Sequence, residues 1–189
     1  MKIRTIAGAV TAVVLLGLVA APAGAAVFLE ARAGYFFPSS ADFREVYKNG
    51  LALGAEVAVP VSKVLGVWAG LDYFSRTGEL TYTQEPTTLR VLTLFAGLKL
   101  QSASGKKVVP YAAAALGYFL FKESSSIGTA SGREFGLLAQ AGVLIKLKAR
   151  TSLDLSVRYT SCSHTVADPE PMSVQLGGIQ VGVGLSFRL

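Results

Sequence analysis

Residues 179–189 read IQVGVGLSFRL at the end of the 189-residue chain. Every odd-numbered position carries an apolar side chain, and the positions between carry Gly, Gln180, Ser186 or Arg188. A period of two residues is typical of a β-strand whose two faces meet different surroundings. This segment is therefore predicted to be a strand with one aliphatic face and one small or polar face.

Residues 151–160 repeat the pattern, because Leu153, Leu155 and Val157 alternate with polar or charged residues that include Asp154 and Arg158. Hydrophobic residues make up 51% of the chain and the mean hydropathy is +0.48. Beyond the first 25 residues they are dispersed at every second position, and no segment is a long uncharged helix candidate. This distribution is typical of strands that face lipid on one side.

The same template predicts eight strands in all. In the fifth the phase is ambiguous, and the preferred phase turns Leu116 outward and Gly117 inward. Connections after the second, fourth and sixth strands are predicted to be short and the others long, which is typical of bacterial barrels with both termini in the periplasm. We therefore predict an all-β fold, an eight-stranded antiparallel up-and-down transmembrane β-barrel. The approximate strand ranges are 27–36, 51–59, 65–74, 89–101, 109–121, 135–147, 151–160 and 179–189.

Aromatic residues gather where the odd-numbered strands reach the long loops. We interpret them as an interfacial girdle, because amphipathic rings favour the level of the lipid headgroups. They are Tyr35, Phe36, Phe37, Tyr73, Phe74, Tyr118, Phe119, Phe121 and Tyr159.

The amino terminus has the form of a signal peptide. Lys2 and Arg4 precede an apolar run over residues 6–21, and Pro22 and three small residues follow. These features predict a signal peptide over residues 1–25 and one mature domain over residues 26–189. The alternative, an anchoring helix, is disfavoured because the run is short and breaks at Pro22.

Charge and cysteine content restrict the possible functions. Without Lys2 and Arg4 the 18 basic residues become 16, against 12 acidic residues, so the mature chain carries +4. No dense basic cluster is present, and no nucleic-acid partner is expected. Cys162 is the only cysteine, so no internal disulfide can form and stability must come from hydrogen bonding and burial.

The whole predicted mature chain resembles the outer-membrane protein β-barrel domain family of small Gram-negative surface barrels in three features: the number of strands, the alternation of short and long loops, and the carboxyl-terminal strand. The resemblance implies the fold, a location in the bacterial outer membrane and outer-membrane lipids as surroundings. Leu185, Phe187 and Leu189 resemble the carboxyl-terminal signal read by the barrel assembly machinery, an implied partner during biogenesis. Family members often end in phenylalanine, whereas this chain ends in Leu189. Resemblance of architecture implies little about activity.

Charged residues on the predicted inward faces are the first candidate site. Paired carboxylates could act as an acid and a base, but an eight-stranded barrel is only wide enough to be filled by side chains. Because buried charges need partners, we interpret the set as a structural plug. The set comprises Glu30, Arg32, Glu56, Asp72, Lys99, Lys146, Asp154, Arg158 and Arg188.

The last long loop is the second candidate site, because residues 161–164 read Ser-Cys-Ser-His and Asp168 and Glu170 follow. Lipid A deacylases are barrels of this size that carry a His-x-Ser pair. Here Thr165 and Val166 follow His164, so the pair is missing and the nucleophile–base geometry is not secured. One histidine and one cysteine also fall short of a zinc ligand set. We expect an ordinary exposed loop.

Two glycine-containing motifs point to other classes of ligand-binding protein, and both are rejected. Residues 66–68 read Gly-Val-Trp, as in lipocalins, but lie in the wrong strand, and the predicted faces are the reverse of a lipocalin's. Residues 182–184 read Gly-Val-Gly but open no helix, so they are not a phosphate-binding loop. These glycines are expected to relieve crowding inside the barrel.

The remaining loops carry weaker signals. In residues 39–47, Ser39 and Asp42 have capping-box spacing and predict a short helix that covers the barrel mouth or contacts a partner. In residues 77–88 the alternation continues, so the flanking strands are expected to extend beyond the membrane. The short turns carry basic residues that we expect to contact anionic phospholipid heads at the periplasmic leaflet. They are Lys63, Lys106, Lys107, Lys148 and Arg150.

The preferred functional interpretation is a monomeric, non-enzymatic surface barrel that stabilises the envelope or binds a macromolecule or surface through its long loops. The alternative is an outer-membrane lipid-modifying enzyme of the lipid A deacylase type, or a carrier of small apolar molecules. No catalytic residue, cofactor or metal site is predicted. The sequence does not identify the ligand of the loops.

Overall fold

The first and last strands of the barrel lie side by side and close it. The computed structural model describes residues 26–79, 85–102, 107–126, 128–166 and 172–189. Strand β1 (Phe28–Pro38) pairs antiparallel with β10 (Gly178–Arg188) along its whole length, from Phe28 opposite Arg188 to Pro38 opposite Gly178. Closure leaves no unpaired sheet edge along this seam. An unpaired edge would expose backbone N–H and C=O groups to lipid, where they have no hydrogen-bond partners.

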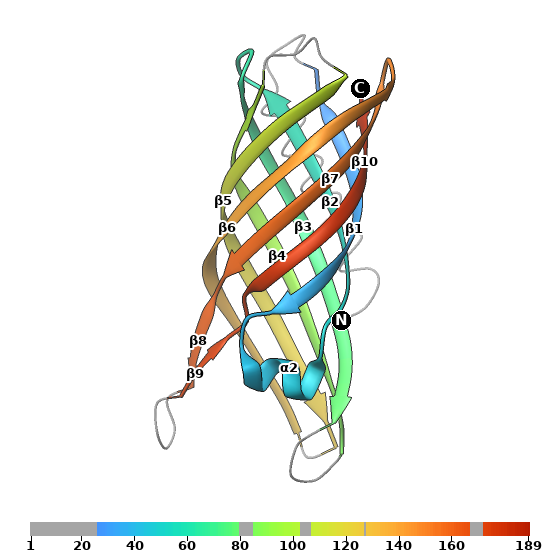
Figure 1. Ribbon diagram of the computed structural model, residues 1–189. Helices are drawn as coiled ribbons and strands as arrows, with labels where there is room; N and C mark the ends of the chain where they lie inside the picture. Colours follow the sequence, from blue (N-terminus) through green and yellow to red (C-terminus); the bar gives the residue numbers. More distant parts are fainter. Residues whose placement is uncertain (1–25, 80–84, 103–106, 127, 167–171) are drawn as a thin grey trace.

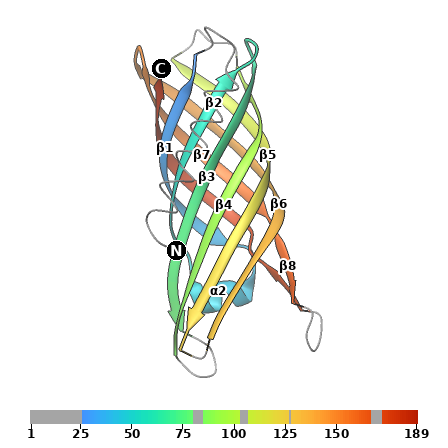
Figure 2. The same cartoon turned by 180° about the vertical axis from the view of Figure 1, so that it is seen from behind.

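Eight strands complete the barrel in the order β1-β10-β7-β6-β5-β4-β3-β2, each antiparallel to its neighbours (Figure 1, Figure 2). The prediction of an eight-stranded antiparallel up-and-down barrel is confirmed. The other six barrel strands are β2 (Gly50–Pro60), β3 (Leu65–Glu79), β4 (Pro86–Gln101), β5 (Val108–Ser125), β6 (Gly128–Lys148) and β7 (Thr151–Ser161).

The predicted alternation of inward and outward faces is confirmed over most of the barrel, including the preferred phase of the fifth strand, but Val57, Val59, Leu71 and Leu92, which were predicted to be outward, are buried. Leu116 of β5 is exposed on the outer wall whereas Gly117 is buried. Exposed aliphatic and aromatic side chains encircle the barrel, as a wall in contact with lipid requires. Examples from six strands are Leu53, Leu98, Leu116, Leu137, Val157 and Val181.

The two ends of the barrel differ. At the end that holds the carboxyl terminus the connections are short, over residues 61–64, 102–107 and 149–150. Long loops were predicted at all four connections of the other end, and this is wrong for the second and third, because β3 and β4 reach residues 79 and 86 and β5 and β6 reach residues 125 and 128. The expected extension of the strands that flank residues 77–88 is confirmed, since β3 ends at Glu79 and β4 begins at Pro86.

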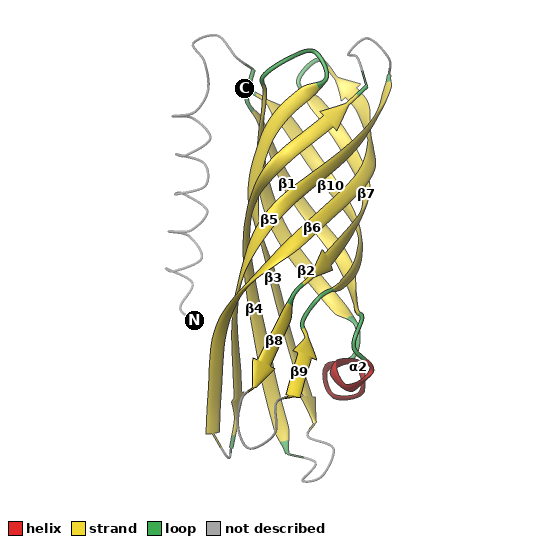
Figure 3. Ribbon diagram, turned by 90° about the vertical axis from the view of Figure 1, so that its left-hand side faces the viewer, coloured by secondary structure: helices red, strands yellow, loops and turns green. Residues whose placement is uncertain are grey.

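The last long connection contains a hairpin that was not predicted. Strands β8 (Ser163–Val166) and β9 (Met172–Gln175) pair antiparallel in a separate two-stranded sheet. In Figure 3 this hairpin projects from the barrel at the same end as the helix of the first connection. Because termini and short turns mark the periplasmic side, this end is extracellular.

The predicted helix of the first connection is present as α2 (Ala41–Tyr47). Its N-cap is Ser40, whose hydroxyl accepts a hydrogen bond from the Phe43 N–H at 3.4 Å, so the predicted cap at Ser39 is wrong by one residue. The Ser39 N–H is engaged elsewhere, with the Gly177 carbonyl at 3.0 Å. The helix lies across the extracellular mouth of the barrel (Figure 1).

Two predictions concern residues outside this description. The predicted signal peptide, residues 1–25, lies outside the described residues. Lys106 does as well, whereas Lys63, Lys107, Lys148 and Arg150 are exposed at the short-turn end, where lipid contact stays a prediction.

Within the described ranges, no helix is both long enough and apolar enough to cross a membrane.

Candidate functional site: the barrel lumen and its extracellular mouth

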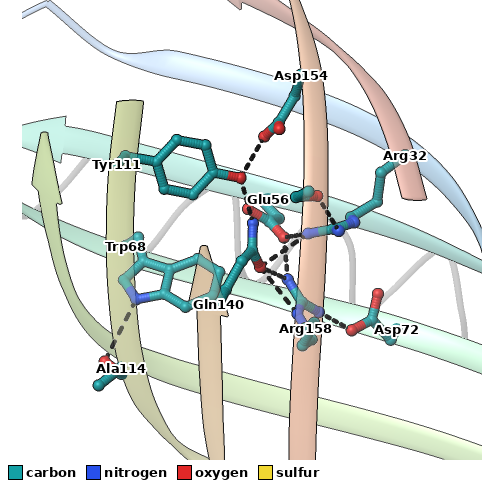
Figure 4. Close-up of polar contacts among 10 residues, drawn as sticks. Arg32, Glu56, Trp68, Asp72, Tyr111, Ala114, Gln140, Asp154 and Arg158 are labelled. Atoms are coloured by element: carbon teal, nitrogen blue, oxygen red, sulfur yellow. Dashed lines mark hydrogen bonds and ion pairs between the residues drawn. The ribbon is translucent and has the colours of Figure 1, made fainter. Parts of the chain in front are cut away.

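A group of polar side chains crosses the lumen at mid-height, and we call it the lumenal charge network. Its centre is Arg158 of β7, whose side chain forms ion pairs with Glu56 of β2 and Asp72 of β3. These strands lie on opposite sides of the barrel in the closed order, so the ion pairs span the lumen. The members of the network are Arg32, Glu56, Asp72, Tyr111, Gln140, Asp154, Ser156 and Arg158 (Figure 4).

Arg32 of β1 is the second cation of the network. It forms an ion pair with Glu56, and its guanidinium donates to Gln140 Oε1 at 2.9 Å and to Ser156 Oγ at 2.8 Å. Glu56 therefore accepts from both arginines, and Gln140 accepts from both as well, with Arg158 Nε at 2.9 Å. Because both guanidinium groups bind the same two acceptors, each restricts the position of the other.

Tyr111 of β5 links the arginines to Asp154, the single carboxylate of β7. Its hydroxyl donates to Asp154 Oδ2 at 2.6 Å and accepts from Gln140 Nε2 at 2.6 Å. The Lys99 ammonium lies 3.9 Å from the centre of the Tyr111 ring. A full chain of contacts thus runs from Arg32 through Gln140 and Tyr111 to Asp154.

Aromatic rings cover the network on the β3–β4 side. The Arg158 guanidinium lies 4.6 Å from the Phe95 ring centre and 5.4 Å from that of Trp68. Trp68 is buried and its indole N–H points to the Ala114 carbonyl at 3.4 Å. The tryptophan of the Gly-Val-Trp motif therefore packs in a charged lumen, in agreement with the rejection of a lipocalin-like ligand site.

Glycines make room for the network, as expected for the glycines of residues 182–184. A Cβ atom on Gly184 would lie 2.5 Å from Glu30 Oε1, and one on Gly142 would lie 2.8 Å from the Tyr111 hydroxyl. A Cβ on Gly142 would also lie 2.6 Å from the Leu155 carbonyl oxygen, so this position excludes a side chain, whereas at Gly184 the Glu30 carboxylate would have to move aside.

The structure brings part of the predicted inward set together. Arg32, Glu56, Asp72, Asp154 and Arg158 join the network as described, and Lys99 contacts it through the Tyr111 ring. Glu30 is buried nearby and lies opposite Ser186 of β10, whereas Arg188 is exposed at the periplasmic rim and Lys146 is only partly buried. The carboxylates that pair with Arg158 lie on β2 and β3, across the barrel from β7.

Sequence reasoning missed the neutral members of the network. Gln140 and Ser156 fall on the predicted inward faces but have no predicted role, and Tyr111 is not among the predicted inward residues. One signal was available for Tyr111, because turning Ala112 outward in the fifth strand turns Tyr111 inward. The need for uncharged donors follows from the excess of lone pairs on three buried carboxylates, Glu56, Asp72 and Asp154.

Above the network, toward the extracellular side, the lumen is apolar. We call the residues that fill it the aromatic cluster: Phe36, Phe43, Tyr47, Phe74 and Phe119. Phe36 and Phe74 meet edge to face with ring centres 5.2 Å apart, and Phe43 of α2 lies 6.4 Å from Phe74. The helix therefore closes the mouth by inserting its aromatic face into the barrel.

The predicted aromatic girdle is consequently only half correct. Tyr35, Phe37 and Tyr159 are exposed on the outer wall, but Phe36, Phe74 and Phe119 point inward. The residues alternate along each strand like any others, so runs such as Tyr35-Phe36-Phe37 must divide between the two faces.

The second candidate site, in the last long connection, is only partly described. Backbone pairing places His164 opposite Val174, while the His164 side chain, Asp168 and Glu170 lie outside the described residues. Cys162 is buried, and burial, together with the charge of Glu134, raises the pKa of its thiol to about 11. A thiol with that pKa is a poor nucleophile at neutral pH. Among the described residues, no group of His, Cys, Asp and Glu could hold a metal ion.

Comparison with known proteins agrees with this architecture. No curated protein sequence matches the chain significantly. Among solved structures, OprG of Pseudomonas aeruginosa superposes with a TM-score of 0.64 at 14% identity, covering 86% of this chain and 96% of that one. Neisserial surface protein A superposes with a TM-score of 0.62 at 16% identity, covering 88% and 97%. Similarity at this level of identity concerns the fold.

The attachment invasion locus protein Ail of Yersinia pestis, solved in complex with the heparin analogue sucrose octasulfate, also superposes, with a TM-score of 0.54 at 16% identity, covering 86% and 98%. The family model described as "Outer membrane protein beta-barrel domain" matches residues 11–187, nearly the whole chain. The chain therefore belongs to the outer membrane protein β-barrel domain family and is located in the bacterial outer membrane.

Proposed function

We propose that this protein is a closed, non-enzymatic surface barrel that acts through its extracellular end. The observation that carries the proposal is the lumenal charge network, because Arg158 and Asp154 at its core are both 0% exposed. The cavities on the periplasmic and extracellular sides of the network have volumes of about 40 Å³ each, enough for a few water molecules. A solute could pass only if these packed side chains separated.

The extracellular end supplies the surface for interaction. Strands β5 and β6 stay paired beyond the outer apolar band, from Phe121 opposite Gly132 to Ser125 opposite Gly128. The β8–β9 hairpin projects beside them. Polar hairpins held rigidly by a barrel can present side chains to a partner or accept an added strand at an edge.

A trimmed barrel tests the proposal. Replacing residues 163–175 by a short turn removes the β8–β9 hairpin, and a control variant shortens the periplasmic turn at residues 102–107 instead. Both should still migrate differently when boiled and unboiled, because the closed hydrogen-bond network resists detergent. Pull-down from native membranes, with bound proteins and lipids read by mass spectrometry, should show that only loss of the hairpin removes partners bound by the full chain.

Two results would contradict the proposal and favour the alternatives. Chemically altered outer-membrane lipids that depend on His164 and Ser163 would favour a lipid-modifying enzyme. Steady, large unitary conductance in planar bilayers would show that the lumen opens, and would favour a carrier of small molecules.

A further inference from the structure

Three adjacent strands carry a cation at the same height on the outer wall. They are Arg90 of β4, Lys122 of β5 and Arg133 of β6, and all three are exposed. On each strand the next outward residue toward the periplasm is apolar: Leu92, Leu120 and Phe135. Each cation is thus the first polar group above the apolar band of its strand.

The height of this patch matches the edge of the membrane. About ten residues separate Arg90 from Leu100, the last outward leucine of β4. At roughly 3.3 Å per residue and a tilt of about 40° they span about 25 Å along the membrane normal, which is the usual height of the apolar band. The three cations therefore lie where the headgroups of the outer leaflet begin.

The strand register brings the cations together. Arg90 lies directly opposite Lys122, and Arg133 lies opposite Leu120, one outward position away from Lys122. On β3, the residue opposite Arg90 is the uncharged Ser75. Outward side chains on directly opposed residues have Cβ atoms about 5 Å apart, so the positive charge is concentrated in one patch on the β4–β6 side.

The described part of the chain does not neutralise this patch. None of the three cations forms an ion pair with a described residue. The neighbouring carboxylate of Glu123 points into the mouth, where it accepts hydrogen bonds from Tyr47 and Thr87. Like charges directly opposed across a sheet destabilise it, so an external anion would relieve the repulsion.

The cations stand beside a depression in the outer wall. Its described lining consists of the three cations, the partly exposed Tyr73 and Leu120, the almost fully buried Leu92, and Phe121, Ser131 and Gly132 at the level of the cations. Cations thus lie along the extracellular side of the depression and apolar side chains along the membrane side, which is the arrangement that an anionic lipid would match with its headgroup and its acyl chain.

We propose that Arg90, Lys122 and Arg133 bind the phosphate of a phosphorylated glycolipid of the outer leaflet, of the lipid A type, with an acyl chain against Tyr73 and Leu120. Guanidinium groups bind phosphate through paired hydrogen bonds and an ammonium group binds it as a point charge. The site lies on the outer wall at the base of the β5–β6 extension, so it is independent of the lumen and of the β8–β9 hairpin.

The test measures lipid retention by the refolded mature chain in a neutral detergent. Wild type, the variant R90Q/K122Q/R133Q and the control R44Q/K48Q/R76Q are incubated with bis-phosphorylated lipid A, and bound lipid is counted by native mass spectrometry. The control removes the same charge at the same end but away from the outer wall. At low salt, we expect the patch variant to bind tenfold to a hundredfold more weakly, and the control to bind like wild type.

Two further probes identify the ligand chemistry. Dephosphorylated lipid A should be retained no better by wild type than by the patch variant, and millimolar inorganic phosphate should not displace bound lipid A. Equal retention by the patch variant and wild type, equal loss in the control, or displacement by free phosphate would each overturn the proposal. If the triple variant does not regain heat-modifiable migration, R133Q alone is measured against R76Q with the same criteria.

Discussion

The two levels of the lumen are held together in different ways. In the lumenal charge network, directional bonds join residues from β1, β2, β3, β5, β6 and β7, and every charge depends on a partner. In the aromatic cluster, rings from β1, β3, β5 and α2 fill space, and no single contact is indispensable. A buried charge that loses its partner costs far more than a ring that loses a neighbour. The two levels should therefore respond differently to substitution.

The largest effect is expected from Arg158→Ala, which leaves Glu56 with one cation and Asp72 without its ion pair. Stranding buried carboxylates should lower the free energy of unfolding by about 3–5 kcal/mol. Urea unfolding in lipid vesicles measures the change. Asp154→Ala should also destabilise the barrel, because it removes the acceptor of the Tyr111 hydroxyl.

Two controls show whether the effect comes from stranded charge. His164→Ala, in the β8–β9 hairpin, should unfold like wild type. The double variant R158M/D72N should be less destabilised than the sum of its single variants, because each change removes the other's unmatched charge. A wild-type-like Arg158→Ala together with an inactive His164→Ala would overturn the structural interpretation and favour catalysis in the loop.

In the aromatic cluster we expect a smaller effect, from Phe119→Leu. The Phe119 ring covers Gly117 and Gly136, whose added Cβ atoms would lie 2.9 Å and 2.8 Å from it. Leucine fills part of this space, so the loss should be about 1–1.5 kcal/mol in the same urea experiment. The loss should add to that of Arg158→Ala, since the two levels share no hydrogen bond. Strong coupling between the two substitutions would show that the levels are one unit.

The same division explains how much could be predicted from the sequence. Alternation assigned the faces of all eight strands, and it identified the charged residues because a charge on a lipid-facing wall is so unfavourable. Alternation does not predict ion pairs across the lumen, because strand register and barrel closure determine which of Glu30, Glu56 and Asp72 meets Arg158. Aromatic residues suit both faces, and this is why Phe74 and Phe119 were assigned to the girdle although they lie inside.

The pH dependence of the free energy of unfolding tests the hydrogen bond between Tyr47 and Glu123 at the extracellular mouth. Burial raises the pKa of Tyr47 above its ordinary value, and the hydrogen bond that its hydroxyl donates to Glu123 raises it further. Because the folded pKa is the higher one, this stabilisation is complete below about pH 10 and falls as the pH rises above that value. Tyr47→Phe should cost about 1 kcal/mol at pH 7. Urea midpoints at pH 7, 9 and 11 should show equal losses at the first two and a smaller loss at the third.

The smallest effect is expected at the end of α2, where a substitution should stabilise the mouth. Lys48 has φ 56° and ψ −173°, a conformation that glycine adopts readily and other residues do not. Its N–H donates to the Arg44 carbonyl at 3.1 Å and its side chain is exposed, so Lys48→Gly loses no packing. Relief of backbone strain should outweigh the entropy that glycine adds to the unfolded chain, so the free energy of unfolding should rise by about 0.5–1 kcal/mol. Lys48→Ala should give no such gain. Hydrogen exchange of the α2 amides measures this locally. Slower exchange in Lys48→Gly with unchanged exchange in β7 would show that the mouth closes independently of the lumenal charge network; a uniform change in both would show that they open together.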